Sequence, residues 1–111
     1  MHEMALAQDV LRKVLKAAAE TKLQKVSLVK VNIGETRVSD KAELVELFAQ
    51  VSKGTTADEA KLIVTVMPLM AFCKSCKKDF SAGEMKKGCP KCESEDFEIV
   101  SGKEVLITEI K

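Results

Sequence analysis

Hydrophobic positions at the start of the chain recur with the spacing of one helix face. Between Glu3 and Glu20, apolar residues such as Leu6, Val10 and Val14 stand three or four positions apart. This spacing predicts an amphipathic helix whose apolar stripe packs into the core. A helix that docks into a partner's groove is the alternative interpretation.

The central part of the chain predicts a second helix. Asp40 and Glu43 have the spacing of a capping box, and apolar residues then follow helical spacing until Lys53-Gly54. Because glycine commonly follows the last turn of a helix, the helix is expected to end there.

Three further segments have the pattern of strands. Residues 25–33 are rich in β-branched residues and end at Gly34, and residues 62–67 are almost wholly apolar and end at Pro68. A third apolar segment, residues 105–110, follows a turn at Gly102. Between the second and third segments lie all the cysteines of the chain.

The cysteines form two metal-binding turns. Cys73 and Cys76 make one C-x-x-C pair, and Cys89 and Cys92 make another after twelve intervening residues. This spacing favours one tetrahedral zinc ion held by four thiolates, a closed site that supplies folding energy rather than catalysis. Iron in a rubredoxin-like cage is the main competitor, although the absence of Trp and Tyr leaves a thin aromatic shell for it. Two disulfides or a thioredoxin-like redox pair are disfavoured, because the chain lacks a signal peptide and a βαβ setting.

These patterns predict an α+β fold, in which two helices pack on a small three-stranded sheet and a zinc-ribbon module is inserted between the last two strands. A chain of 111 residues is too short for two independent hydrophobic cores. We therefore expect one α/β domain, residues 1–69 plus 100–111, and a zinc-binding module, residues 70–99.

Composition and charge argue against a membrane protein and against a nucleic-acid-binding protein. No apolar run approaches the ~20 residues of a membrane helix, so a cytoplasmic protein without a membrane partner is expected. The net charge of +1 and the absence of Trp and Tyr argue against nucleic-acid binding. The lysines near the cysteines mostly offset the formal charge of a zinc tetrathiolate. A zinc-ribbon module that binds protein or nucleic acid stays open as the alternative function.

The amino terminus carries a second candidate metal site. His2 is the only histidine, and its imidazole and backbone nitrogen lie close to the Met1 amine and the Glu3 amide. Such nitrogen donors suit Ni(II) or Cu(II), and the first N–H groups of a helix have no intrahelical acceptor to lose. A solvated terminal histidine is the plainer alternative. A metalloenzyme is disfavoured, because one histidine beside four committed cysteines cannot build an open zinc site.

Several motifs together resemble the HypA family of nickel metallochaperones. They are Met1-His2-Glu3-Met4, Ile33-Gly34-Glu35, Lys53-Gly54-Thr55, the paired cysteine turns and Ser101-Gly102-Lys103-Glu104-Val105. The resemblance implies a non-enzymatic accessory protein that inserts nickel during maturation of [NiFe]-hydrogenase, and in some organisms urease.

The same resemblance implies partners and metal ligands. The partners are a GTPase of nickel insertion and the hydrogenase large subunit or urease pathway proteins. The resemblance implies that His2 binds the cargo nickel, together with backbone nitrogens of Met1 and Glu3, and that the four cysteines bind structural zinc. Two departures from the family pattern stand out: Ser39-Asp40-Lys41 where many relatives have a proline, and Glu93 and Glu95 where some have histidines.

Overall fold

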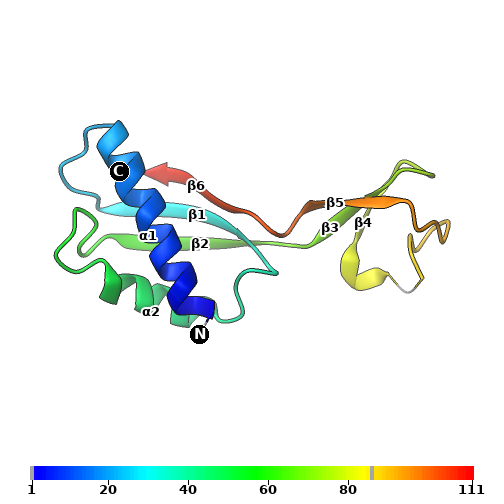
Figure 1. Ribbon diagram of the computed structural model, residues 1–111, viewed down its shortest axis with the longest axis horizontal. Helices are drawn as coiled ribbons and strands as arrows, with labels where there is room; N and C mark the ends of the chain where they lie inside the picture. The colour runs from blue at the N-terminus through cyan, green and yellow to red at the C-terminus, as the bar shows by residue number, and fades with distance from the viewer. Residues whose placement is uncertain (1, 86) are drawn as a thin grey trace.

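Two small sheets lie along the long axis of the molecule, which measures 52 × 28 × 16 Å (Figure 1). A computed structural model describes residues 2–85 and 87–111, except for the side chain of His2. The elements in chain order are α1 (His2–Glu20), β1 (Leu28–Gly34), α2 (Lys41–Val51), β2 (Lys61–Met67), β3 (Met70–Cys73), β4 (Asp79–Ser81), the 3-10 helix η1 (Ala82–Glu84), β5 (Phe97–Ser101) and β6 (Val105–Ile110).

The first sheet has β1 at its centre, in the order β2-β1-β6. β1 is parallel to β2 and antiparallel to β6, so that Val31 lies opposite Val64 on one side and Ile107 on the other. The predicted three-stranded sheet, with an insertion between its last two strands, is therefore confirmed. β2 and β6 occupy opposite edges, and both chain segments that enter or leave the insertion pass the end of β1 (Figure 1).

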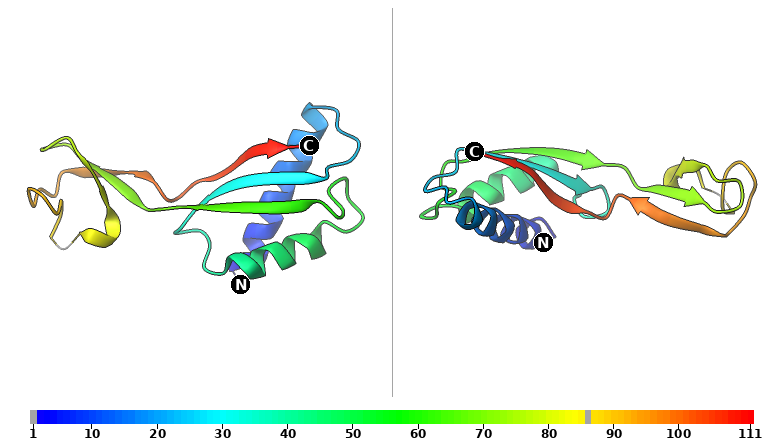
Figure 2. Two further views of the ribbon diagram at one scale, coloured as in Figure 1. Left: turned by 180° about the vertical axis from the view of Figure 1, so that it is seen from behind. Right: turned by 90° about the horizontal axis from the view of Figure 1, so that it is seen from above.

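Both predicted helices are confirmed, and they cover one face of this sheet (Figure 2). Strand residues alternate in burial, with Val29, Val31 and Ile33 buried against the helices. They share a core with the apolar stripe of α1 and with Leu44 and Phe48 of α2. None of the described helices is long and apolar enough to cross a membrane.

The second helix begins where its capping residue predicts. The Asp40 side chain accepts a hydrogen bond from the Glu43 amide at 3.0 Å. This contact satisfies one of the amides that have no partner within the helix. The position of Asp40 therefore fixes where the loop between β1 and α2 ends.

The second sheet, in the order β4-β3-β5, forms a separate module beyond β2. Its small core consists of Ala71, Cys73, Phe80 and Cys89, with Phe97 packed against it. The rings of Phe80 and Phe97 meet edge to face with centroids 5.6 Å apart. The sequence patterns indicated a cysteine loop here but not its own three-stranded sheet.

Backbone atoms meet directly where the two sheets join. A Cβ atom on Gly34 would lie 2.0 Å from the carbonyl carbon of Gly102, and one on Gly102 would lie 2.4 Å from Leu69 Cα. The amide of Thr36 donates to the Gly102 carbonyl oxygen at 3.1 Å, and its hydroxyl donates to the same oxygen at 2.7 Å. The chain needs glycine at positions 34 and 102 because a side chain there would collide with backbone.

Two carboxylates secure the same junction. Glu35 accepts a hydrogen bond from the Leu69 amide, and Glu104 accepts one from the Gly102 amide at 2.6 Å. Amide donors, those of Glu104 itself and Gly102 foremost, lower the pKa of the Glu104 carboxyl below its ordinary value. The junction therefore favours the ionised form of Glu104.

Replacing Gly34 with Ala tests the close contact. We expect Gly34→Ala to destabilise the protein by at least about 2 kcal/mol, because backbone must move to admit the methyl group. Gly83→Ala is the matched control: among the described residues its added Cβ meets only the Ser81 hydroxyl oxygen, at 3.7 Å, and an effect below about 1 kcal/mol is expected. Urea unfolding curves measure both, and equal stability of the two variants would contradict the contact.

Replacing Glu104 with Gln tests the carboxylate. Since the folded pKa is lowered, the stabilisation is present above the ordinary value of 4.5 and is lost as pH falls through the lower folded pKa. We expect the wild type to unfold at higher urea concentration than Glu104→Gln at pH 7, and the difference to shrink as the pH is lowered below 4.5. Glu98→Gln, on an exposed residue of β5, is the control. A difference unchanged by acid would exclude this role of the carboxylate.

Candidate metal centre

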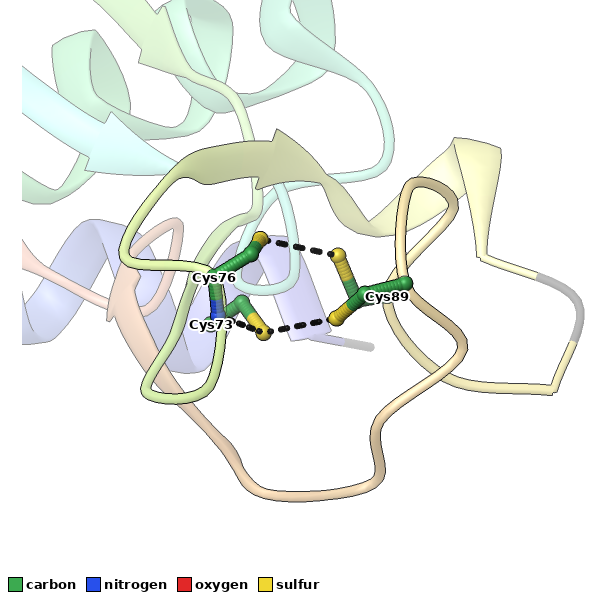
Figure 3. Close-up of side chains that lie close together, drawn as sticks. Cys73, Cys76 and Cys89 are labelled. Atoms are coloured by element: carbon green, nitrogen blue, oxygen red, sulfur yellow. Dashed lines mark hydrogen bonds between the residues drawn. The ribbon is translucent and has the colours of Figure 1, made fainter.

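The four cysteine sulfurs gather between two tight turns. All four Sγ atoms lie within 4.8 Å of one another. Cys73 is 3.5 Å from Cys92, and Cys76 is 3.7 Å from Cys89, measured between sulfurs. Figure 3 shows the side chains of Cys73, Cys76 and Cys89 pointing into the same space. All four are free thiols, so the disulfide alternative is not the state of this structure.

The first turn is shaped by the backbone around Cys73. The Cys73 carbonyl accepts from the Lys77 amide at 2.8 Å, and the Cys73 amide donates to the Lys78 carbonyl at 2.9 Å. Lys77 has a left-handed backbone with φ of 59°. The Cys76 amide also points at the Cys73 sulfur, 3.5 Å away.

The second turn repeats this geometry around Cys89. The Cys89 carbonyl accepts from the Glu93 amide at 2.8 Å, its amide donates to the Ser94 carbonyl at 2.9 Å, and Glu93 has φ of 62°. The Lys91 amide points at the Cys89 sulfur, 3.5 Å away. A hydrogen bond of 2.8 Å between the hydroxyls of Ser75 and Ser94 joins the two turns.

The protonation of the thiols shows why a cation belongs here. The backbone amide of Cys76 lowers the pKa of Cys73 to about 7. Burial, followed by contacts with the neighbouring thiols, raises the pKa of Cys76 to about 12. Without a positive charge between them, the four thiols therefore do not ionise together at neutral pH. A divalent metal ion offsets the repulsion and holds the thiolates in ionised form.

The spacing of the sulfurs fits a tetrahedral ion. Metal–sulfur bonds of about 2.3 Å at tetrahedral angles separate the sulfurs by about 3.8 Å. The 3.5 and 3.7 Å separations agree with this value. The predicted cysteine residues thus form one four-thiolate metal site, and such a site has no position for a substrate.

The amino-terminal candidates lie elsewhere in the molecule. His2 is the first residue of α1, and the start of α1 lies beside the start of α2, outside the cysteine module (Figure 1). Met1 and the side chain of His2 are outside the described residues. The Glu3 side chain is buried, with 3% of its surface exposed. Its carboxylate accepts hydrogen bonds from the amide and the hydroxyl of Ser39.

The contact between Glu3 and Ser39 has no signal in the sequence pattern. The two residues are 36 positions apart, and neither periodicity nor a short motif relates them. A partial clue is the place of Ser39 just before Asp40, the predicted helix cap, which gives its position in the fold.

Comparison with known proteins identifies the family. The model for "Hydrogenase/urease nickel incorporation, metallochaperone, hypA" matches residues 1–111. The chain belongs to the HypA family. Similar proteins include the hydrogenase maturation factors HypA of Desulfitobacterium hafniense, 30% identical over 100% of this chain and 97% of the relative, and of Francisella philomiragia, 33% identical over 99% and 97%.

A solved HypA structure has the same fold. The solution structure of the Ni metallochaperone HypA from Helicobacter pylori superposes with a TM-score of 0.73. It is 24% identical, and the match covers 100% of this chain and 97% of that one. The arrangement of the two helices and the two sheets is therefore an established HypA fold.

Removing the metal tests the dependence of the module on its site. Because the only buried hydrophobic side chains among the described residues of the module are Ala71, Cys73, Phe80 and Cys89, we expect a strong chelator to unfold residues 70–101 while both helices and β1 stay folded. Hydrogen exchange resolved by segment measures this. Cys76→Ser should give the same pattern, whereas Ser75→Ala in the same turn should keep the metal. Full protection of residues 70–101 after chelation would refute the expectation.

Proposed function

We propose that this protein is a nickel metallochaperone that binds Ni(II) at its amino terminus and delivers it during maturation of [NiFe]-hydrogenase, with urease as the alternative recipient. The observation that carries the proposal is the match of the nickel-incorporation family model to residues 1–111. The closed geometry of the cysteine site supports the division of roles, because a cargo metal must be released.

We assign zinc to the cysteine site. Four thiolates at tetrahedral spacing suit zinc, which has no redox chemistry and fits a purely structural role. Residues 70–99 form the zinc-binding module in this proposal, and residues 1–69 plus 100–111 form the nickel-binding domain. The paired turns and the Ser75–Ser94 hydrogen bond hold the module together around the ion.

Nickel is assigned to His2, with backbone nitrogens of Met1 and Glu3. The amide of Glu3 lies in the first turn of α1, where backbone N–H groups have no intrahelical acceptor. Metal binding there breaks no helical hydrogen bond. Imidazole and deprotonated amides suit Ni(II), and protons compete for all of them, so acid releases the cargo.

Delivery requires exchange of ligands with another protein. A GTPase of nickel insertion and the large subunit of hydrogenase, or the urease pathway proteins, are the proposed partners, in the cytoplasm. A terminal site suits such exchange because a partner's donors can approach from solvent. The protein itself breaks no bond in a substrate and acts as a carrier rather than an enzyme.

Replacing His2 with Ala tests the nickel assignment. Loss of outer-shell groups at metal sites typically weakens binding about 10–100-fold, so loss of a ligand should weaken nickel binding by more than about 100-fold. Calorimetric titration measures the affinity, and metal analysis should still find one zinc per chain. Cys76→Ser is the reciprocal control, and we expect it to lose zinc before it loses nickel. Unchanged nickel affinity in His2→Ala would overturn the assignment.

A further inference from the structure

We propose that Ser39 is a positioning residue for the nickel-binding terminus. In this proposal the Glu3 carboxylate accepts hydrogen bonds from Ser39, a contact called here the Ser39–Glu3 clamp, and does not bind the metal. The inference rests on the proposed function, because it concerns how the amino terminus is held ready for nickel. It adds a residue from the loop between β1 and α2 to a site otherwise made from the first residues of the chain.

The contacts at Glu3 are the first observation. The Ser39 hydroxyl oxygen lies 2.9 and 3.0 Å from the two carboxylate oxygens of Glu3, and the Ser39 amide donates to one of them at 3.2 Å. The Glu3 side chain is 3% exposed. A buried carboxylate needs such donors, since an unpaired buried charge is strongly unfavourable. Both of its oxygens are thus engaged within the protein.

Ser39 is itself held in place from both directions along the chain. Asp40, the residue that follows Ser39, is held in place because it caps α2. On the other side, the Arg37 amide donates to the Gly34 carbonyl at 2.8 Å, and Thr36 donates to the Gly102 carbonyl. The loop from Glu35 to Asp40 is therefore attached to the sheet, to the segment that leaves the module and to α2. A rigid loop can orient the side chain that it contacts.

The orientation of Glu3 determines that of the first turn of α1. With its side chain buried against Ser39, the backbone of residue 3 has a fixed rotation about the helix axis. The nitrogen donors assigned to nickel belong to this backbone and to the residues next to it. If the turn is ordered only part of the time, the apparent affinity falls in proportion to the ordered fraction.

The test uses the full-length, zinc-loaded protein and Ni(II) alone as the probe. Ser39→Ala removes the hydroxyl donor, and Ser39→Thr keeps it. We expect Ser39→Ala to weaken nickel binding about tenfold, as loss of an outer-shell hydrogen bond does at other metal sites, and Ser39→Thr to stay within about twofold of the wild type. Zinc content is expected to stay the same in both variants. The urea unfolding midpoint of Ser39→Ala should fall modestly, because the Ser39 amide still donates to the buried Glu3 carboxylate after the hydroxyl is removed.

A second measurement separates positioning from general loosening. In the Glu3→Ala background, which has no side-chain acceptor for Ser39, adding Ser39→Ala should lower nickel affinity by a much smaller factor than it does alone, because the two residues act as a pair. Full additivity, or normal affinity in Ser39→Ala, would overturn the clamp. His2→Ala, measured in parallel, tests the proposed function separately: if it binds nickel normally, the terminal site is wrong, whereas if it alone loses nickel, only the Ser39 assignment fails.

Discussion

Direct backbone contact at the end of β1 is the constraint on which both halves of the molecule depend. Because β2 and β6 lie on opposite edges of the first sheet, the chain segments leading to and from the module must converge past Gly34. A Cβ atom at this residue would lie 2.0 Å from the Gly102 carbonyl carbon, so no side chain fits between them. The Gly34 amide bonds to the Glu104 carbonyl at 2.7 Å, and the Glu35 amide bonds to the Met67 carbonyl at 2.8 Å. The two segments are thereby held to β1 at the point where the sheets separate.

Features that depend on neighbours in sequence were predictable, and those that depend on distant backbone were not. A few neighbouring residues are enough to recognise the helical spacing in α1, the cap at Asp40 and the cysteine pairs. The pairing of β3 with β5 does not, because both strands are short and their partners are set by the metal-bound turns between them. Because their partners are far apart in sequence, the contact of Gly34 with Gly102 and the hydrogen bonds between Glu3 and Ser39 could not be predicted either. Only the folded chain brings these residues together.

The cysteine site and the proposed nickel site differ in how strongly the protein encloses the ion. In the cysteine site, amides aimed at the sulfurs and the mutual repulsion of the thiolates make a bound cation part of the fold. Among the module's described residues, the only buried hydrophobic side chains apart from cysteines are Ala71 and Phe80, so the module has little other source of stability. Such a site retains its metal. A carrier that must also release a metal needs a second, more open set of donors, and the amino terminus has the nitrogen donors that suit nickel.

The loop between β1 and α2 connects these two requirements. Thr36 contacts the segment leaving the module, and Ser39 contacts the first turn of α1, so one short loop touches both the junction of the two sheets and the amino-terminal helix. Hydrogen bonds to a charged group contribute on the order of 1.5–3 kcal/mol each. That is enough to order a helix end for nickel binding, yet it is small compared with the free energy of folding. In the proposed transfer, a partner's donors therefore displace the terminus without unfolding the sheet that supports it.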